Sequence, residues 1–249
     1  MKGTAVGTAA LCLMSVAAFG ADLRLPAPVV PLPFTWTGCY AGVQAGGGFG
    51  QKDLNDSAGV VSPIAGFTSA NLNISGYMVG GQIGCDYQFA SNWVIGIEGA
   101  ATGGKVGGSV GVATPGLPGD NATFKQTTDF LSSATARVGY AWDRWLLYGK
   151  GGAAWAGDRY SAFDALATYD FEGLETRFGW TAGAGIEWAF FDDWSLKLEY
   201  DYYGFGTRSV TFIDNVGGTI GPLDIKQNIH VILLGVNLHV YATGAPLRW

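Results

Sequence analysis

Residues 194–203 read WSLKLEYDYY, and apolar and polar side chains alternate along them. One set of alternate positions is apolar or aromatic: Trp194, Leu196, Leu198, Tyr200 and Tyr202. The other set is mainly polar: Ser195, Lys197, Glu199, Asp201 and Tyr203. Successive side chains of a β-strand point to opposite faces of the sheet. The stretch therefore predicts a strand with one apolar face and one face that is mainly polar or charged.

The same two-residue period recurs in seven other segments, each bounded by turn-forming residues. Together with the first stretch they predict eight strands, near residues 36–50, 76–89, 93–104, 128–142, 145–156, 177–190, 194–206 and 226–241. These are long compared with strands of soluble proteins, which average about 5–6 residues. They are long enough for tilted strands that cross a bilayer, which need about 9–11 residues.

The connections between these segments alternate in length. Residues 90–92, 143–144 and 191–193 are tight turns, whereas the long polar segments are 51–75, 105–127, 157–176 and 207–225. Short periplasmic turns and longer extracellular loops are typical of outer-membrane barrels. An open sheet edge would leave backbone groups unpaired in hydrocarbon. We therefore expect a closed, eight-stranded, antiparallel up-and-down transmembrane β-barrel, with both termini on the periplasmic side.

Composition agrees with this fold class. The 249 residues include 40 glycines, 14% are aromatic and only 14% are charged, against roughly 25% charged residues in soluble domains. After the N-terminus no apolar run approaches the length of about 20 residues that a membrane-spanning helix needs. The formal net charge of −6 and the absence of a basic patch argue against nucleic acid as a partner.

The N-terminus has the features of a secretory signal. Lys2 precedes a short apolar run over 5–18, and Ala18 and Gly20 place small residues at the −3 and −1 positions. We predict a signal peptide over 1–20, cleaved after Gly20. Residues 21–33 contain four prolines, which disfavour helix and central strand, and are expected to form a periplasmic linker. The barrel is assigned to 34–249.

Tryptophans cluster beside the predicted tight turns. Amphipathic rings favour the headgroup level of a bilayer, so these residues predict an aromatic girdle: Trp93, Trp142, Trp145, Trp188 and Trp194. The alternative is a soluble, lipocalin-like barrel in which the rings pack into a core.

Charged residues on the other face are expected to point into the bore: Asp86, Glu98, Arg137, Lys150, Glu187, Lys197, Glu199 and Asp201. An eight-stranded barrel has an interior just wide enough for side chains to fill, and buried charges must be paired or hydrated. The set is either an ion-pair network that blocks the bore or a narrow, gated path for small solutes. The barrel size favours the first interpretation.

Two cysteines remain after the predicted processing, Cys39 and Cys85, on adjacent strands. If the first hairpin is symmetric about residue 62, they face each other at a separation that a disulfide can bridge. The periplasm permits disulfides. One hypothesis is a cross-strand disulfide near the periplasmic rim, and the alternative is two small thiols that face lipid.

No constellation for catalysis or metal binding emerges. His230 and His239 are the two histidines, and neither sits in a spacing typical of a zinc site. No serine and acid can be placed beside His230 from the sequence. We therefore predict no catalytic residues, no metal and no cofactor.

Six segments resemble the alphaproteobacterial outer-membrane β-barrel family, often labelled the porin family or outer-membrane immunogenic proteins. They are WTGCYAGV (36–43), RVGYA (137–141), LYGKGG (147–152), GWTAGAGIE (179–187), LKLEY (196–200) and GVNL (235–238). The resemblance implies a barrel similar to the transmembrane domain of OmpA. The family usually ends on an aromatic that closes the last strand. Here Val240 and Tyr241 occupy that place and residues 242–249 follow, so the sequence does not fix the residue at which the last strand ends.

The expected function is non-enzymatic: an outer-membrane barrel that anchors and stabilises the membrane, presents surface loops and offers at most a narrow pore for small solutes. Its expected partners are outer-membrane lipid, lipopolysaccharide and the barrel-assembly machinery. The alternative is a surface receptor for haem or a host factor. Aromatic residues near the loops motivate that alternative: Tyr160, Phe163, Tyr169, Phe171 and His230.

Overall fold

The computed structural model describes residues 34–55, 69–113, 121–164, 170–213 and 219–240. The chain divides into two units, residues 1–32 and 33–249. The first unit, which holds the predicted signal peptide and most of the predicted linker, lies outside the described residues, as do residues 242–249. No helix within the described ranges has the length and apolar character needed to cross a membrane.

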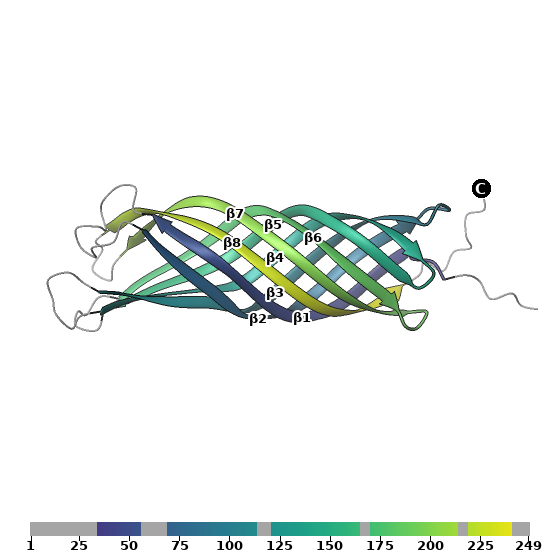
Figure 1. The fold of residues 1–249 in the computed structure, drawn as a ribbon, viewed down its shortest axis with the longest axis horizontal. Coiled ribbons are helices and arrows are strands. Elements are labelled where there is room, and N and C mark those ends of the chain that lie inside the picture. The colour runs from purple at the N-terminus through teal and green to yellow at the C-terminus, as the bar shows by residue number, and fades with distance from the viewer. Residues whose placement is uncertain (1–33, 56–68, 114–120, 165–169, 214–218, 241–249) are drawn as a thin grey trace, which may run out of the picture. The chain divides into compact units, whose positions relative to one another are not determined.

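Eight strands form a closed antiparallel barrel (Figure 1). They are β1 (Gly38–Asn55), β2 (Ser69–Gln88), β3 (Trp93–Ala113), β4 (Asn121–Trp142), β5 (Trp145–Asp164), β6 (Asp170–Ala189), β7 (Trp194–Ile213) and β8 (Thr219–Val240). Each strand pairs with the next, and β1 pairs with β8 along a continuous seam from Cys39–Val240 to Asn55–Asp224. The predicted fold class is confirmed.

The three predicted tight turns all lie at one end of the barrel, here called the turn end. The opposite end is called the loop end. The segments that connect the strands there lie outside the described residues. Asn92 and Asp143 have positive φ angles of 66° and 53°. Short polar side chains tolerate this left-handed region better than bulky ones do, which explains the residue types at two of these turns.

The strands run further toward the loop end than predicted. The expected loops 51–75, 105–127, 157–176 and 207–225 are in large part β-strand, and most of the ladders continue into them. The β2–β3 pairing ends at Ser75 and Gly107, and the β6–β7 pairing is interrupted between Trp180 and Glu172. The misprediction has a physical reason. The outward positions there become polar, as in Asn73, Lys105 and Arg159, so the alternation of apolar and polar side chains disappears although backbone pairing continues.

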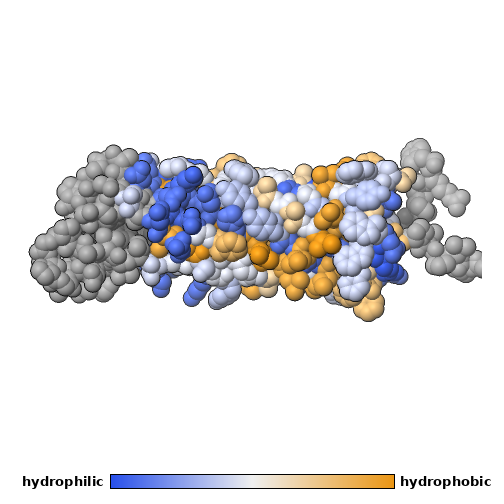
Figure 2. Space-filling model, viewed as in Figure 1, coloured by the Kyte–Doolittle hydropathy of each residue, from blue (hydrophilic) through white to orange (hydrophobic). Residues whose placement is uncertain are grey.

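The outer surface divides along the barrel axis. Figure 2 shows hydrophobic residues concentrated over the half that includes the turn end, and hydrophilic residues on the half next to the loop end. Exposed outward side chains such as Ile83, Ile97, Leu198 and Leu234 belong to the apolar half. Strands of 18–22 residues are about twice the length that a bilayer crossing requires. The barrel therefore has an apolar band and a polar extension.

Candidate functional site

The candidate site is the interior of the barrel, which side chains fill in layers. At the turn end, Trp36, Val94 and Leu146 form an apolar cluster. Next comes an ionic layer, which we call the turn-side ion cluster. It contains all eight charged residues predicted to face the bore, from β2 to β7, and each is 6% exposed or less: Asp86, Glu98, Arg137, Lys150, Glu187, Lys197, Glu199 and Asp201.

Arg137 is at the centre of this cluster. Its guanidinium holds Asp86 through two contacts: Nε donates to Oδ1 at 2.7 Å, and Nη2 pairs with Oδ2. Nη1 lies 3.4 Å from Glu187 Oε2. The rings of Tyr40 and Tyr148 flank the guanidinium, with centroids 4.6 and 4.9 Å from Cζ. A planar, bidentate and ring-stacked cation is a role that arginine fills better than lysine.

Two lysines join the remaining carboxylates. Lys150 Nζ lies 3.0 Å from Glu98 Oε1, 2.7 Å from Glu199 Oε1 and 3.2 Å from Asp201 Oδ2. Lys197 Nζ lies 3.4 Å from both Glu98 Oε2 and Glu199 Oε2. The pairing crosses the bore, because these residues come from β3, β5 and β7.

Sequence reasoning missed the neutral members of the cluster. Tyr40 Oη donates to Glu98 Oε2 at 2.8 Å, and Tyr148 Oη donates to Glu199 Oε2 at 2.6 Å. Both tyrosines occupy inward positions of strands whose outward positions are apolar, and this alternation could have placed them in the bore. These hydroxyls give each of the two carboxylate oxygens a close donor in addition to Lys197, which lies 3.4 Å from both.

Glu187 gathers a serine and a histidine that sequence reasoning did not bring together. Ser195 Oγ lies 2.5 Å from Glu187 Oε1 and 2.8 Å from His239 Nε2. In a serine–histidine–acid triad, the acid holds the far ring nitrogen of the histidine and the substrate can reach the serine. Here Glu187 approaches His239 at the same Nε2, at 3.5 Å, and Ser195 is fully buried. Ser195, His239 and Glu187 thus form one buried hydrogen-bonding network.

A second ionic layer lies near the loop end, and we call it the loop-side ion cluster. Asp158 accepts from Lys52 Nζ at 3.2 Å and lies 3.1 Å from Arg177 Nε. Gln126 and Thr128 donate to Asp158 Oδ1 at 3.1 and 2.6 Å. Three of these residues fall in segments expected to be loops, so the missed strand ends explain why the cluster was not predicted.

Buried apolar side chains separate the two ion clusters, and we call them the apolar layer. From the turn end, the inward residues of β8 are His239, Asn237 and Gly235, then Leu233, Val231 and Ile229, and then Gln227. On β5, Ala154 and Ala156 lie between Lys150 and Asp158. Other members come from the remaining strands: Met78, Val106, Leu131, Tyr203 and Phe205.

The outer surface carries the predicted tryptophans, all of them exposed and near the turn end: Trp93, Trp142, Trp145, Trp188 and Trp194. With Tyr87 and Tyr140 they form what we call the turn-side girdle. Trp145 and Trp188 stack at 5.7 Å between ring centroids. A second ring of exposed aromatics, the loop-side girdle, was not predicted: Phe49, Tyr77, Phe130, Trp155, Phe178 and Trp180.

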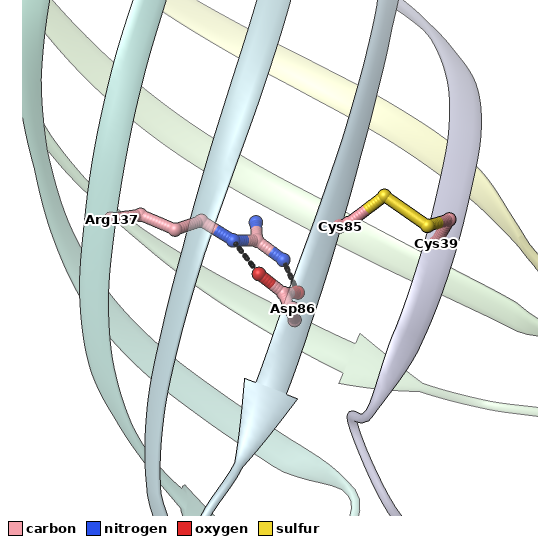
Figure 3. The surroundings of a disulfide bond; sticks show 4 residues. All are labelled: Cys39, Cys85, Asp86 and Arg137. Atoms are coloured by element: carbon pink, nitrogen blue, oxygen red, sulfur yellow. Dashed lines mark hydrogen bonds and ion pairs between the residues drawn. A yellow bond between two sulfur atoms is a disulfide. The ribbon is translucent and has the colours of Figure 1, made fainter.

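Cys39 and Cys85 are joined by a disulfide on the outer surface, with Cα atoms 3.9 Å apart. Figure 3 shows the bond joining β1 and β2, and Arg137 reaching from β4 to Asp86, the residue after Cys85. The disulfide thus ties the neighbouring strands β1 and β2, and the ion pair ties β2 to β4 across β3.

The residues behind the ligand-receptor alternative are only partly described. His230 faces outward at the loop-side girdle, where its Nδ1 lies 2.7 Å from Tyr200 Oη and its ring stacks on Phe49. The structure describes no side chain for Tyr160, Phe163, Tyr169 or Phe171. Across the described part of the chain, no group of three or more His, Cys, Asp and Glu residues could hold a metal.

Comparisons with known proteins agree with this geometry. Residues 8–239 match the model of the outer membrane protein beta-barrel domain. The 31 kDa outer-membrane immunogenic protein of Brucella melitensis is 33% identical, over 90% of this chain and 94% of that protein. The 25 kDa outer-membrane immunogenic protein of Brucella abortus is 29% identical, over 93% and 96%.

Two solved structures share the fold. The outer membrane protein OprG of Pseudomonas aeruginosa has a TM-score of 0.51 at 14% identity, covering 83% of this chain and 99% of OprG. The outer membrane protease OmpT of Escherichia coli has a TM-score of 0.50 at 9% identity, covering 84% of this chain and 99% of OmpT. At these identities the likeness concerns the fold alone.

Proposed function

Because this chain belongs to the outer membrane protein β-barrel domain family, we propose that it is a sealed, non-enzymatic anchor of the bacterial outer membrane. Its barrel holds the chain in the lipid and carries its loops at the cell surface. The relatives that are named immunogenic proteins support surface display of such loops.

The observation that carries the proposal is the apolar layer between the two ion clusters. Met78 is fully buried, Leu131 is 1% exposed and Leu233 is 2% exposed. A hydrophobic constriction opposes the passage of ions by excluding water. A continuous polar path would need hydrated or ionic side chains through this level, and the neighbouring inward positions of β8 are aliphatic.

The turn-side ion cluster has a different role in this proposal. Buried ion pairs contribute little net stability compared with apolar packing, but breaking one leaves an uncompensated charge. Since Arg137 bridges β2 and β4 and Lys150 bridges β3, β5 and β7, a slipped register would orphan several charges at once. The cluster therefore favours one pairing of the strands.

The two girdles support outer-membrane lipid as the main partner. Aromatic rings at two levels bracket the apolar band, as expected for the two headgroup regions of a bilayer. With the tight turns on the periplasmic side, the loop-side girdle and the exposed Lys105, Arg159 and Lys226 beyond it would meet lipopolysaccharide. Insertion would depend on the barrel-assembly machinery, as for other barrels of this class.

Planar-bilayer recording tests the sealed barrel. We expect no stepwise conductance from the folded wild-type chain. We also expect none from Arg137→Ala combined with Lys197→Ala, because the apolar layer remains when the ion cluster is thinned. Heat-modifiable gel migration establishes that the protein in each recording is folded. Reproducible conductance steps from the wild type would refute the proposal in favour of a pore.

The receptor alternative is tested separately. Haem titration followed by absorbance, with intact protein and with a variant lacking residues 165–169, would reveal a ligand site on the loops. Saturable binding that the deletion abolishes would favour a receptor.

A further inference from the structure

The disulfide between Cys39 and Cys85 faces the apolar band rather than water. Both side chains point outward, and the register continues their row to Ile97 in β3 and Ala136 in β4. Tyr87 of the turn-side girdle lies two residues closer to the turn end than Cys85. The bond is therefore on the lipid side of the ring that marks the headgroup level.

The surface beside the bond is hollow and apolar. A groove of about 710 Å³ opens outward there, lined in part by Ile83, Cys85, Ile97, Gly99 and Ala134. In the inserted barrel, lipid chains fill such a groove. Thiol–disulfide exchange needs a thiolate to attack a sulfur atom, and hydrocarbon excludes the charged thiolates of water-soluble proteins.

We propose that a periplasmic thiol–disulfide oxidoreductase forms this bond before insertion, and that insertion then shields the bond from aqueous thiols. One cysteine thiolate attacks the oxidoreductase disulfide, which gives a mixed disulfide and releases one oxidoreductase thiolate. The second cysteine thiolate attacks the mixed disulfide and releases the other. The two cysteines lose two protons and two electrons, and the oxidoreductase disulfide is reduced to a dithiol.

Forming the disulfide before insertion has a structural consequence, because β1 pairs with β8 where the barrel closes. Cys39 pairs with Cys85 on one side and with Val240 of β8 on the other. A slip of one residue would exchange the two faces of the strand. The bond keeps Tyr40 opposite Gly84 and inward, where its hydroxyl meets Glu98. The first hairpin thus enters the membrane with its register already locked.

The order of events can be tested with the full chain, reduced and unfolded in urea. Oxidised oxidoreductase is added under anaerobic conditions, either before or after insertion into phosphatidylcholine vesicles. Free thiols are counted by the gel shift of a maleimide polymer. We expect bond formation after insertion to be at least about tenfold slower than before it, because the thiolates then lie at the hydrocarbon edge. Equal rates would overturn the proposal.

The chain offers a matched control on the same two strands. Gln51 and Asn73 are also paired, outward and exposed, but lie beyond the loop-side girdle. The control carries Gln51→Cys and Asn73→Cys with Cys39→Ser and Cys85→Ser. We expect it to be oxidised at similar rates before and after insertion. A slowdown equal to that of the wild type would mean that barrel rigidity, not lipid, protects the native pair.

Protein taken directly from cells provides the final measurement. The protein is unfolded without reductant and its free thiols are counted. The wild type should have no more of them than the Cys39→Ser, Cys85→Ser variant. Cys12 is unchanged in both chains, so its thiol cancels in the comparison. Two additional thiols in the wild type would overturn the proposal.

Discussion

At the residue scale, the interior is most sensitive to the loss of one partner of a buried ion pair. Arg137 is the clearest case, because one guanidinium pairs with three carboxylates and contacts two aromatic rings, all from other strands. Removing one partner of such a network leaves the others in a low-dielectric bore without compensation. Surface pairs have no comparable effect, because water screens them.

Arg137→Ala is expected to lower the free energy of unfolding by about 3–5 kcal/mol, since Asp86 is left as an uncompensated buried charge. Urea unfolding in lipid vesicles, followed by tryptophan fluorescence, measures the loss. Adding Asp86→Asn should recover part of it. The control is Arg159→Ala, whose partner Asp129 lies 3.3 Å away in an exposed pair, and which should cost no more than about 1 kcal/mol. Equal losses would contradict the role assigned to burial.

At the element scale, each strand has two environments on its outer face. β7 has Leu198 in the apolar band and Thr207 in the polar extension, both exposed on the outside of the barrel. The seam between β1 and β8 adds a steric constraint. A side chain at Gly46 would run into the backbone of Ile232, whereas the nearest atom to one at Gly47 is 3.7 Å away.

Leu198→Arg is expected to destabilise the folded barrel by about 2–4 kcal/mol, because a cation on the lipid face near mid-membrane must leave water. Thr207→Arg on the same strand should change the stability by about 0–1 kcal/mol. The comparison uses unfolding in vesicles, and both variants place an arginine on the outer face of β7, at different depths. Similar effects of both substitutions would contradict the assigned membrane boundary.

Gly46→Ala should weaken the seam, because the new Cβ meets a backbone carbonyl that cannot rotate away, and we expect a loss of about 1–3 kcal/mol. Gly47→Ala on the adjacent outward position should be tolerated. The readout is the temperature at which the folded gel band disappears. If Gly47→Ala is the more harmful of the two, the register of the seam is wrong.

At the scale of the whole molecule, the barrel consists of stacked layers with separate roles. The apolar cluster at the turn end, the turn-side ion cluster, the apolar layer and the loop-side ion cluster follow one another along the interior. On the outside, the two girdles bracket the apolar band, and the polar extension lies beyond the loop-side girdle. Permeability is therefore expected to depend on the apolar layer, and the pairing register of the strands on the turn-side ion cluster.

Hydrating the apolar layer should open the barrel. Leu131→Ser combined with Leu233→Ser places hydroxyls at two buried aliphatic positions and removes part of the dewetted constriction. We expect small conductance steps in planar bilayers from the double variant that migrates as folded protein, and none from the ion-cluster variant. A closed double variant would place the seal elsewhere in the bore.

Much of this architecture was predictable from local patterns. Period-2 alternation such as that of residues 194–203 specified the strands in the apolar band, and the tight turns specified their turn-side ends. The same alternation put Arg137, Lys150 and Glu199 on one face. The loop-side ends were not predictable, because outward polar residues such as Lys105 and Arg159 remove the contrast between faces that alternation depends on.

A period of two is a local property of the chain, so the all-β class, the strand order and the two faces of the predicted strands could be predicted without the structure. The folded barrel was needed to show which charges meet across the bore, that Ser195 and His239 join Glu187, and that an apolar layer separates two ion clusters. Those contacts depend on the stagger between strands that are distant in sequence. That stagger is established when the sheet closes on itself.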